Sequence, residues 1–559
     1  MANKLLFNER FITIQCNRND IETVTLTQNI PYIHSNRILT EFKTTIRNID
    51  VVLKLFRGID WNNIEKAPIT IQQLYEKEMR RRITTKTLID LGPTNEHPWL
   101  WRHQQLGREL AEVNDRYAFF YDTRTGKTPM SYQIILDDLI KHPDHKWLIL
   151  CPLILIENAW LLDGKEMFPQ IKVVGLHDSS KEKRLQRFAM DAQVYVTNIE
   201  SFIAYEEYIK KLPIHGCIID ESSAMKSSSS KFGKAAVEYS SLMKRWYLLS
   251  GTPAPNGEWE YFRQLQSVDF YGVHSSWSQF KTYFFNNVSR NPQYEKLQTK
   301  EEKQGELLGL LKDYSIYVDK EDVLTTPGRE FLEYEVKMPE TLAAQYHKLR
   351  QEMYLELGDN VSIMASSTAA KLNKLNQVTS GFIIDTAAKK RNAYNDTAEE
   401  ETYLLDEYRF NELYKLLATI GDNQVMIWAN YHKEFEMIRR HLGSNCGCIY
   451  GKTNIDEKNQ NIRDFKAGKI QYLVCHPKSA DKGLTLTNAH FAIYFSLGYS
   501  YEAYKQSIER IYGDVIKQKN FCTYYILIAK GSVDKAIYNA VATKGDMSMA
   551  VLNHLKGGL

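Results

Sequence analysis

Two stretches of this chain repeat one rhythm, in which a short apolar run is followed by a loop and then by a segment with helical spacing. The first stretch covers about residues 96–270, and the rhythm returns after about residue 405. Nearly continuous apolar runs that alternate with amphipathic helices are typical of parallel strands covered on both faces. The pattern therefore predicts an α/β protein with two parallel-sheet lobes.

The apolar runs give the expected strands of each lobe. In the first stretch they are Tyr117–Tyr121, Trp147–Cys151, Ile171–Leu176, Gln193–Thr197, Cys217–Ile219 and Trp246–Leu249. In the second they are Val425–Trp428, Cys448–Tyr450, Tyr472–Cys475, Phe491–Phe495 and Thr523–Ile528. A chain of 559 residues has room for several domains, since one domain usually takes about 100–200 residues.

Four domains are expected from the changes in character along the chain. Residues 1–95 combine short β-branched stretches with helical spacing, and they are expected to form a small α/β accessory domain that ends in the turn-rich segment Leu91–Asn95. Residues 96–270 are expected to form the first lobe and residues 406–559 the second. The interval 271–405 has the pattern of a mostly helical, polar insertion or linker.

Composition indicates a packed protein of the cytoplasm. Hydrophobic residues make up 43% of the chain and charged residues 25%, which is typical of globular proteins. The longest apolar run, Trp147–Ile156, is shorter than the roughly 20 residues of a membrane span, and the N-terminal sequence lacks the apolar core of a signal peptide. Seven scattered cysteines without paired ligand spacing argue against a disulfide framework and a zinc site.

Charge is balanced overall but not along the chain. The net charge is +3, from 71 basic and 68 acidic side chains, whereas residues 1–95 carry 14 basic and 10 acidic ones. The triplet Arg80-Arg81-Arg82 lies in this basic segment. Two interpretations stand for it, a contact with nucleic acid and a basic helix face that is simply solvated.

A phosphate-binding loop is indicated where the strand ending at Tyr121 meets the next helical stretch. The segment Asp122–Thr128 contains Gly-Lys-Thr, and such a loop between a strand and a helix can cradle phosphates with its backbone N–H groups. Lys127 would neutralise the phosphates, and Thr128 would hold Mg²⁺. The full phosphate-loop pattern is not met, because Tyr121 stands where its first glycine belongs. An ordinary helix N-cap is therefore the alternative.

Two carboxylates follow the apolar run Cys217–Ile219. Asp220 and Glu221 would stand at the carboxyl edge of a buried strand, where open α/β sheets bind ligands. Asp220 suits a Mg²⁺ contact, and Glu221 suits the base that deprotonates an attacking water. Taken alone, the pair is better explained as an acidic cap of the next helix than as a catalytic pair. A Gly-Lys-Thr loop about 90 residues earlier favours catalysis instead.

In this order the motifs resemble those of superfamily 2 helicase-like motors, and within them the Swi/Snf-like double-stranded DNA translocases. The resemblance covers about residues 98–545 in one collinear order. In the first lobe it rests on the phosphate loop and on Pro98–Gln104, Leu148–Trp160, Val196–Glu200, Asp220–Lys231 and Leu249–Pro253. The last of these contains the signature Ser-Gly-Thr-Pro, and the Asp-Glu segment is similar to phage and prophage forms. In the second lobe it rests on Val425–Asn430, Pro477–Thr487 and Gln506–Arg510.

The resemblance implies two RecA-like lobes with helical insertions and an enzyme, a DNA-dependent ATPase or DNA helicase, that hydrolyses ATP with Mg²⁺. The implied catalytic residues are Glu221, Asp220, Lys127 and Arg510, and the implied metal ligands are Thr128 and Asp220. The implied nucleotide-binding residues are Gln104 as the reader of adenine, Thr125, Gly126, Lys127, Thr128, Gly483, Gln506 and Arg510. Coupling of phosphate release to movement is implied for Ser250 and Thr252. DNA contacts are implied for Pro152, Asn198, Thr485 and Thr487, and the basic triplet suggests further ones at Arg80, Arg81 and Arg82.

One position departs from the family pattern. The final motif usually carries a second arginine three residues after Arg510, and here that residue is Gly513. In the family this arginine acts as a finger on the transferring phosphate, and such fingers contribute roughly 10³–10⁵ to the rate. Three explanations compete: an engineered or spontaneous inactive variant, which the low helix propensity of glycine slightly favours; a lineage that uses another residue, such as Lys517; and a motor that has become a binder.

The expected function is an ATP-dependent translocase or helicase that remodels duplex or branched DNA by branch migration or fork regression, in a bacterial or phage-infected cytoplasm. The compact chain and its phage-like motifs favour DNA over nucleosomes as the substrate. Domain 1–95 loosely resembles accessory DNA-recognition domains, and stabilisation of the first lobe is its alternative role. The rival function is a catalytically silent, ATP-switched DNA-binding clamp. The motor subunit of a restriction system is disfavoured, because no nuclease-like or methyltransferase motif is apparent in the sequence. An RNA helicase fits the Ser-Gly-Thr-Pro motif and the long insertion less well.

Overall fold

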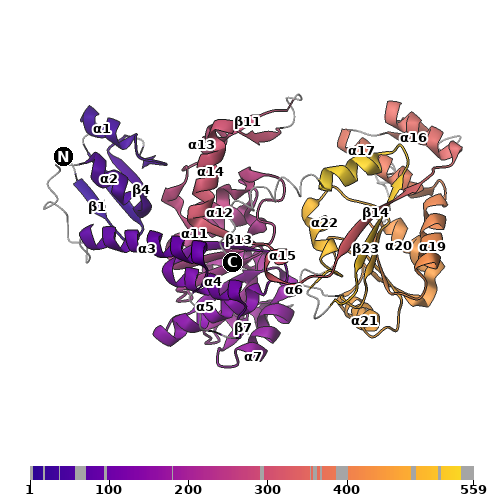
Figure 1. The fold of residues 1–559 in the computed structure, drawn as a ribbon, viewed down its shortest axis with the longest axis horizontal. Helices are drawn as coiled ribbons and strands as arrows, with labels where there is room; N and C mark the ends of the chain where they lie inside the picture. The colour runs from indigo at the N-terminus through magenta and orange to yellow at the C-terminus, as the bar shows by residue number, and fades with distance from the viewer. Residues whose placement is uncertain are drawn as a thin grey trace. The chain divides into compact units, whose positions relative to one another are not determined.

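The computed structural model describes residues 4–16, 19–36, 38–56, 71–93, 97, 99–178, 180–289, 295–352, 354–356, 362–364, 368–385, 401–479, 486–513 and 518–542. The chain divides into two compact units, Met1–Leu324 with Met547–Leu559 and Thr325–Asp546. In Figure 1 the first unit begins in indigo and the second ends in yellow. Within the described residues, no helix combines the length and the apolar character needed to cross a membrane.

The first unit is built around a seven-stranded sheet in which all paired strands are parallel. In spatial order the strands are β13 (Ser315–Val318), β5 (Arg116–Tyr121), β10 (Arg245–Leu249), β9 (Gly216–Asp220), β6 (Trp147–Cys151), β8 (Val194–Asn198) and β7 (Val173–Gly175). The six strands predicted for residues 96–270 are all present. The first predicted lobe is therefore confirmed as a parallel α/β sheet.

Alternate residues of these strands enter two different cores. Along β5, Ala118 and Phe120 belong to one core, whereas Phe119 and Tyr121 belong to the other. A strand buried on both faces needs apolar side chains at every position, because neither face meets water. This double burial is the physical reason why the strands could be recognised as continuous apolar runs.

Helices and short hairpin strands connect the strands of this sheet. The helices are α4 (Arg102–Val113), α5 (Lys127–Lys141), α6 (Leu153–Leu155), α7 (Asp163–Met167), α8 (Lys181–Phe188), α9 (Ile199–Ala204), α10 (Glu206–Ile209), α11 (Lys231–Leu242), α12 (Tyr261–Val268), α13 (Trp277–Phe284), α14 (Glu301–Tyr314) and α15 (Lys320–Val323). A π-helical segment, Ile156–Leu162, follows α6. The pair β11 (Phe285–Asn287) and β12 (Leu297–Thr299) forms an antiparallel hairpin between α13 and α14.

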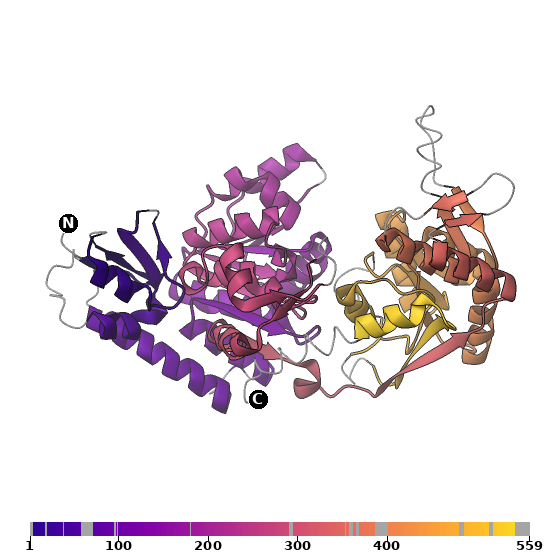
Figure 2. The same cartoon turned by 90° about the horizontal axis from the view of Figure 1, so that it is seen from above.

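The accessory domain also belongs to the first unit. Its antiparallel sheet has the order β1 (Lys4–Phe7), β2 (Phe11–Gln15), β4 (Glu41–Thr45) and β3 (His34–Ser35), and its helices are α1 (Ile21–Thr27), α2 (Ile49–Leu55) and α3 (Ile71–Leu91). The long helix α3 leads from this small sheet toward the large one (Figure 2). Hydrogen bonds join the domain to the lobe, such as Thr45 Oγ1 to Asp269 Oδ2 at 2.5 Å and His34 Nε2 to the carbonyl oxygen of Val273 at 2.8 Å.

The second unit contains a six-stranded parallel sheet. Its spatial order is β14 (Arg329–Val336), β23 (Cys522–Ala529), β22 (Phe491–Tyr494), β19 (Val425–Trp428), β21 (Tyr472–Cys475) and β20 (Cys446–Ile449). The five strands predicted after residue 405 are all present. The helices are α16 (Glu340–Glu352), α17 (Thr368–Thr379), α19 (Tyr408–Ile420), α20 (His432–Leu442), α21 (Ile455–Lys466) and α22 (Tyr501–Ile508), and two hairpins pair β15 (Tyr354–Glu356) with β16 (Ser362–Met364) and β17 (Phe382–Asp385) with β18 (Glu401–Leu404).

The interval 271–405, expected as one helical insertion, is divided between the units. β13 forms an edge of the first sheet, and β14 forms an edge of the second. β14 mixes charged and apolar residues in the sequence REFLEYEV, because an edge strand leaves part of its surface to solvent. Such a mixed segment looks polar along the chain, which is why the periodicity did not separate this strand from its helical surroundings.

Candidate active site

The carboxyl ends of three neighbouring strands bring the predicted phosphate loop and acidic pair to one edge of the first sheet. β5, β10 and β9 are adjacent and parallel, and their register sets Leu249 level with both Phe119 and Asp220. The segments that follow these strands leave the sheet on the same side. They are the phosphate loop after β5, the Ser-Gly-Thr-Pro loop after β10 and the acidic pair at the end of β9.

The loop between β5 and α5 has a backbone conformation that only some residues tolerate. Gly126 caps α5 with φ 73° and ψ 46°, and Arg124 also has a positive φ of 64°. The left-handed conformation favours glycine, and a Cβ on Gly126 would lie 2.0 Å from Nε2 of Gln104, so it would displace that amide. Thr125 is fully buried, and its hydroxyl donates to the carbonyl oxygen of Asp122 at 2.7 Å.

Lys127 is the first residue of α5, and the loop itself holds its ammonium group. Nζ donates to the carbonyl oxygens of Tyr121 at 3.0 Å and Asp122 at 3.2 Å. Carbonyl oxygens satisfy the donors of an ammonium group without neutralising its charge. The charge therefore stands beside a helix N-terminus, where anions are bound favourably. Thr128 follows in the first turn of the helix and is half-buried.

Gln104 supports this loop from α4. Its Nε2 donates to the carbonyl oxygens of Thr125 at 3.1 Å and Gly126 at 3.3 Å, and its Oε1 accepts from the backbone N–H of Trp101 at 3.0 Å. The neighbouring His103 ring lies 2.7 Å from the same Thr125 oxygen, and burial lowers its pKa. The side chain that the sequence nominated as the adenine reader is thus bonded to the phosphate loop.

The acidic pair combines a restrained carboxylate with an unusual backbone. Oδ1 of Asp220 accepts from the backbone N–H of Glu221 at 3.0 Å, and Oδ2 accepts from the indole Nε1–H of Trp160 at 3.1 Å. Glu221 has φ 58° and ψ 55°, a left-handed conformation that costs a non-glycine residue about 1–3 kcal/mol. Its Oε2 is buried and has no hydrogen-bond partner within the described part of the chain. Because buried polar atoms are nearly always paired, this oxygen marks a place for a water or a ligand.

The loop after β10 packs directly on the phosphate loop. Ser250 and Thr252 are buried, and the backbone N–H of Thr252 donates to Oγ of Ser250 at 3.1 Å. A Cβ on Gly251 would lie 3.2 Å from the backbone nitrogen of Thr123 and 3.3 Å from Oδ1 of Asp122. The two loops therefore approach closely at Gly251, and a Cβ there would press on the phosphate loop. Movement of one loop would therefore displace the other.

Gln264 on α12 is a part of this site that sequence reasoning missed. Its Oε1 accepts from Oγ of Ser222 at 2.8 Å, and its Nε2 donates to the carbonyl oxygen of Pro253 at 2.8 Å. The side chain is 1% exposed, so it links the acidic segment to the Ser-Gly-Thr-Pro loop from within the protein. Along the sequence it stands among other polar residues of an amphipathic helix, and nothing there sets it apart.

This edge of the sheet fits a nucleoside triphosphate with Mg²⁺. The N-terminal backbone of α5 and Lys127 suit the phosphates. Carboxylate and hydroxyl oxygens are the ligands that Mg²⁺ prefers, and Asp220 and Thr128 supply one of each. The unpartnered Oε2 of Glu221 adds an acceptor where a water can be activated.

Two of the predicted DNA contacts lie at the same edge. β6 and β8 are neighbours, and their register sets Cys151 level with Asn198. Pro152, directly after β6, is half-buried. Asn198 is only 4% exposed, and its Nδ2 donates to Oε2 of Glu200 at 2.5 Å. Both positions stay predicted DNA contacts, and Asn198 offers little exposed surface of its own.

The arginine triplet lies on α3, and its members differ in their surroundings. Arg81 pairs with Glu78 through Nε at 2.7 Å and donates from NH1 to Oδ1 of Asn114 at 2.8 Å. Arg82 pairs with Glu78 through Nε at 3.0 Å. The glutamate can reach both because it lies three and four residues earlier on the helix. Arg80 is the member of the triplet that remains exposed.

The second unit holds the remaining predicted positions. Gln506, on α22, is 9% exposed, Arg510 is 6% exposed, and Gly513 is buried. The backbone N–H of Leu486 donates to the carbonyl oxygen of Arg510 at 2.9 Å, which places the half-buried Thr487 near the final motif. Four positions named from the sequence lie outside the described residues: Pro98, Gly483, Thr485 and Lys517.

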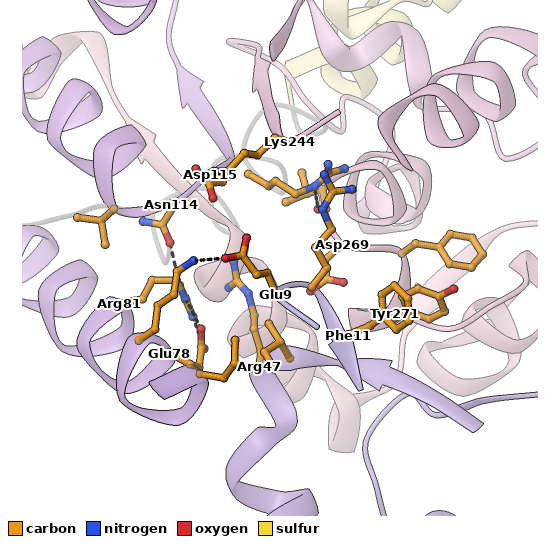
Figure 3. A pocket seen from close by; sticks show the side chains of 18 of the residues that line it. Glu9, Phe11, Arg47, Glu78, Arg81, Asn114, Asp115, Lys244, Asp269 and Tyr271 are labelled. Atoms are coloured by element: carbon orange, nitrogen blue, oxygen red, sulfur yellow. Dashed lines mark hydrogen bonds and ion pairs between the residues drawn. The ribbon is translucent and has the colours of Figure 1, made fainter. Parts of the chain in front are cut away.

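A cavity of about 850 Å³ lies at the opposite edge of the first sheet, between the lobe and the accessory domain. Asp115 and Lys244, which precede β5 and β10, line it together with Glu9 and Arg81 (Figure 3). Seven basic and six acidic side chains line the cavity, so their charges nearly cancel. The phosphate-loop edge, and not this cavity, therefore carries the features of a nucleotide site.

Two family matches cover most of the chain in sequence order. Residues 22–396 match the SNF2-related domain, and residues 408–512 match the helicase conserved C-terminal domain. Protein p41 of Acyrthosiphon pisum secondary endosymbiont phage 1 is 25% identical over 375 residues, which are 65% of this chain and 77% of that protein. The DNA repair and recombination protein RAD54-like of Drosophila pseudoobscura pseudoobscura is 22% identical over 458 residues, 73% of this chain and 56% of that protein. This chain thus spans little more than half of the RAD54-like relative.

Two solved structures are similar at low identity. The Sulfolobus solfataricus SWI2/SNF2 ATPase core in complex with dsDNA is 17% identical with a TM-score of 0.36, and the match covers 84% of this chain and 99% of that one. The core domain of the same ATPase is 18% identical with a TM-score of 0.37, and the match covers 83% and 92%. The SNF2-related match alone spans more than half of the chain, and the helicase C-terminal match follows it directly. This chain therefore belongs to the SNF2-related family, within the Swi/Snf-like group of superfamily 2 that its motifs predicted.

Proposed function

We propose that this protein is a Mg²⁺-dependent ATPase that acts on duplex DNA. The observation that carries the proposal is the single sheet edge that unites Lys127, Asp220 and Glu221 behind the phosphate loop. Membership of the SNF2-related family and the helicase C-terminal match support it. A relative named for DNA repair and recombination supports DNA as the substrate.

The residues at this edge divide the work of hydrolysis. The N-terminal backbone of α5 and Lys127 would bind the terminal phosphates and stabilise the charge that develops on them. Thr128 and Asp220 would hold Mg²⁺, which when bound supplies electrostatic stabilisation of the transferring phosphoryl group. Glu221 would orient the attacking water and accept its proton, since its Oε2 is not engaged by any described residue.

The same geometry offers a route from hydrolysis to movement. The Ser-Gly-Thr-Pro loop lies against the phosphate loop, and Gln264 ties it to the acidic segment through Ser222. A change at the phosphates would therefore shift Ser250 and Thr252 together with the acidic pair. The helicase C-terminal match contains Gln506 and Arg510, and both stay predicted nucleotide contacts. A translocating motor must alternate between two conformations, here those before and after this shift.

Within this function we propose branched DNA as the preferred substrate, remodelled by branch migration or fork regression. The similarity to a protein named for DNA repair and recombination supports this choice. The accessory domain, bonded to the first lobe, would then present the exposed Arg80 to one arm of the DNA. A phosphate-directed grip of this kind is salt-dependent and largely independent of sequence.

Steady-state ATP hydrolysis tests the proposal. Turnover with Mg²⁺ is compared without DNA, with linear duplex and with a four-way junction at equal nucleotide concentration. We expect DNA to stimulate hydrolysis and the junction to stimulate it most. Lys127→Ala, the matched inactive control, should hydrolyse ATP under none of these conditions. Turnover that ignores both DNAs would contradict a DNA-dependent motor.

A catalytically silent, ATP-switched clamp is the second candidate, and Gly513 is the observation that favours it. Glycine cannot supply the charge that an arginine finger places on the transferring phosphate. The native chain and its Gly513→Arg variant are compared in the same assay. Turnover confined to the variant would identify a disabled motor, and turnover in both would show that another residue supplies the charge. Silence in both, with DNA binding that depends on ATP, would establish the clamp.

A further inference from the structure

Trp160 forms a hydrogen bond with Asp220, the carboxylate proposed to hold Mg²⁺. The indole Nε1–H donates to Oδ2 of Asp220 at 3.1 Å, and the two side chains are 0% and 6% exposed. The tryptophan stands 60 residues before its partner, in the π-helical segment Ile156–Leu162. π-Helical turns are rare, and they are frequent at functional sites.

The position of the indole is itself restrained. Its ring packs on Tyr132 of α5 with centroids 5.6 Å apart, and the Tyr132 hydroxyl donates to the carbonyl oxygen of Trp160. α5 is the helix that begins with Lys127. Asp220 is thereby supported by the same helix that presents the phosphate-binding lysine, so the metal side and the phosphate side of the site share one rigid base.

A carboxylate that binds a metal must be held at a particular rotation. The backbone N–H of Glu221 restrains Oδ1 of Asp220, but that bond joins adjacent residues and leaves the side-chain rotation to other groups. The bond from Trp160 to Oδ2 supplies a further point of attachment, from a distant part of the chain. Hydrogen bonds from outer groups to metal ligands orient those ligands, and their loss typically costs about 10–100-fold in metal affinity.

We propose that Trp160 is a positioning residue that sets the orientation of Asp220 for the Mg²⁺ of Mg²⁺-ATP. This inference rests on the proposed ATPase function and adds a residue to its site. Trp160 does not touch the nucleotide in this assignment, and it acts through Asp220. Its loss should therefore weaken metal binding and leave metal-free nucleotide binding intact.

The chain offers a matched control in Trp147. Its Nε1–H donates to Oδ2 of Asp138 at 2.9 Å, and these two side chains are 0% and 1% exposed. Trp147 opens β6 and lies level with Gly216, the first residue of β9, so it stands at the sheet edge opposite Asp220. Trp147→Phe removes the same kind of buried bond as Trp160→Phe, at a distance from the phosphate loop.

The test compares the full-length protein with its W160F and W147F variants. Mn²⁺ replaces Mg²⁺, and its binding in the presence of ADP is measured by electron paramagnetic resonance. Binding of a fluorescent ATP analogue in EDTA reports the nucleotide site without metal, and thermal denaturation reports stability. We expect W160F to weaken Mn²⁺ binding by about 10-fold or more, while W147F leaves it unchanged. The affinity for the analogue in EDTA should be unchanged in both.

The outcomes separate this inference from the function on which it rests. Mn²⁺ binding by W160F that equals that of W147F would overturn the role of Trp160 alone. If W160F loses as much affinity for the ATP analogue in EDTA as it loses for Mn²⁺, the role of Trp160 is also overturned. The defect would then be one of folding. A native protein that binds no Mn²⁺ with ADP would overturn both the inference and the proposed function. Asp220→Asn, which removes the ligand itself, gives the lower limit of binding.

Discussion

The Nε2 amide of Gln104 donates a hydrogen bond to the carbonyl oxygen of Thr125 at 3.1 Å, so the predicted reader of adenine is bonded to the phosphate loop. The second bond of the amide, to Gly126 at 3.3 Å, reaches the residue that caps α5. Gln104 is 4% exposed, and both of its polar atoms are engaged within the protein. The arrangement indicates that Gln104 supports the phosphate loop, and not that it contacts a base.

This relationship predicts the behaviour of Gln104→Ala. Loss of its bonds loosens the loop, and one net hydrogen bond contributes about 0.5–1.5 kcal/mol, so KM should rise up to about tenfold. The rise should be equal for ATP and GTP, because the phosphates are common to both. Gln105→Ala is the control, since the Gln105 amide bonds the carbonyl oxygens of His97 and Leu100 instead. A loss confined to ATP would show that Gln104 reads adenine.

Glu221 joins catalysis to backbone strain, and two substitutions separate these effects. Glu221→Gln should lower turnover by about 10²–10⁴-fold and keep nucleotide binding, because it removes the base and little else. Glu221→Gly should be equally inactive, but its free energy of unfolding should exceed that of Glu221→Gln by about 1 kcal/mol, since glycine adopts φ 58° without cost. Urea denaturation followed by circular dichroism measures the difference. Equal stabilities would mean that the left-handed conformation stores no strain.

A buried ion pair is predicted to hold the second unit together. Arg409 NH1 lies 2.6 Å from Oδ2 of Asp534, and the side chains are 1% and 4% exposed. Asp534→Asn should lower the free energy of unfolding by about 3–5 kcal/mol, because it leaves a buried guanidinium without its counter-charge. The control is Lys535→Gln, which breaks an exposed pair with Glu333 next to it and should cost less than about 1 kcal/mol. Similar losses in the two variants would contradict the prediction.

His274 makes the stability of the first unit dependent on pH. Burial lowers its pKa to about 4, while the nearby charged groups are Glu306, His34 and Lys303. The unfolded chain takes up this proton near pH 6.5 but the folded chain does not, so stability is complete above pH 6.5 and falls as the pH is lowered toward 4. His274→Phe keeps the ring packing and removes the titration. The melting temperature of the variant should therefore fall less between pH 7 and pH 5 than that of the native protein.

The strands and the catalytic edge were predictable for a common reason. β5, β6, β9, β10 and β19 are buried on both faces, which forces the apolar runs that predicted them. In parallel strands the carboxyl ends meet at one edge, so the sequence alone predicts that Lys127 and Asp220 lie at the same edge. The division of residues 271–405 was not predictable, since the edge strand β14 mixes charged and apolar residues like its solvated surroundings.

By itself the sequence determined the α/β class, the order of the motifs and the residue types of the phosphate loop and acidic pair, because these depend on local patterning along single segments. Only the tertiary structure decided which partners those residues have. Trp160 reaches Asp220 across 60 residues, and Gln264 reaches Ser222 across 42. Such pairs form where two segments are packed within hydrogen-bond distance. The identity of a polar or aromatic residue does not indicate which distant atom its side chain will contact.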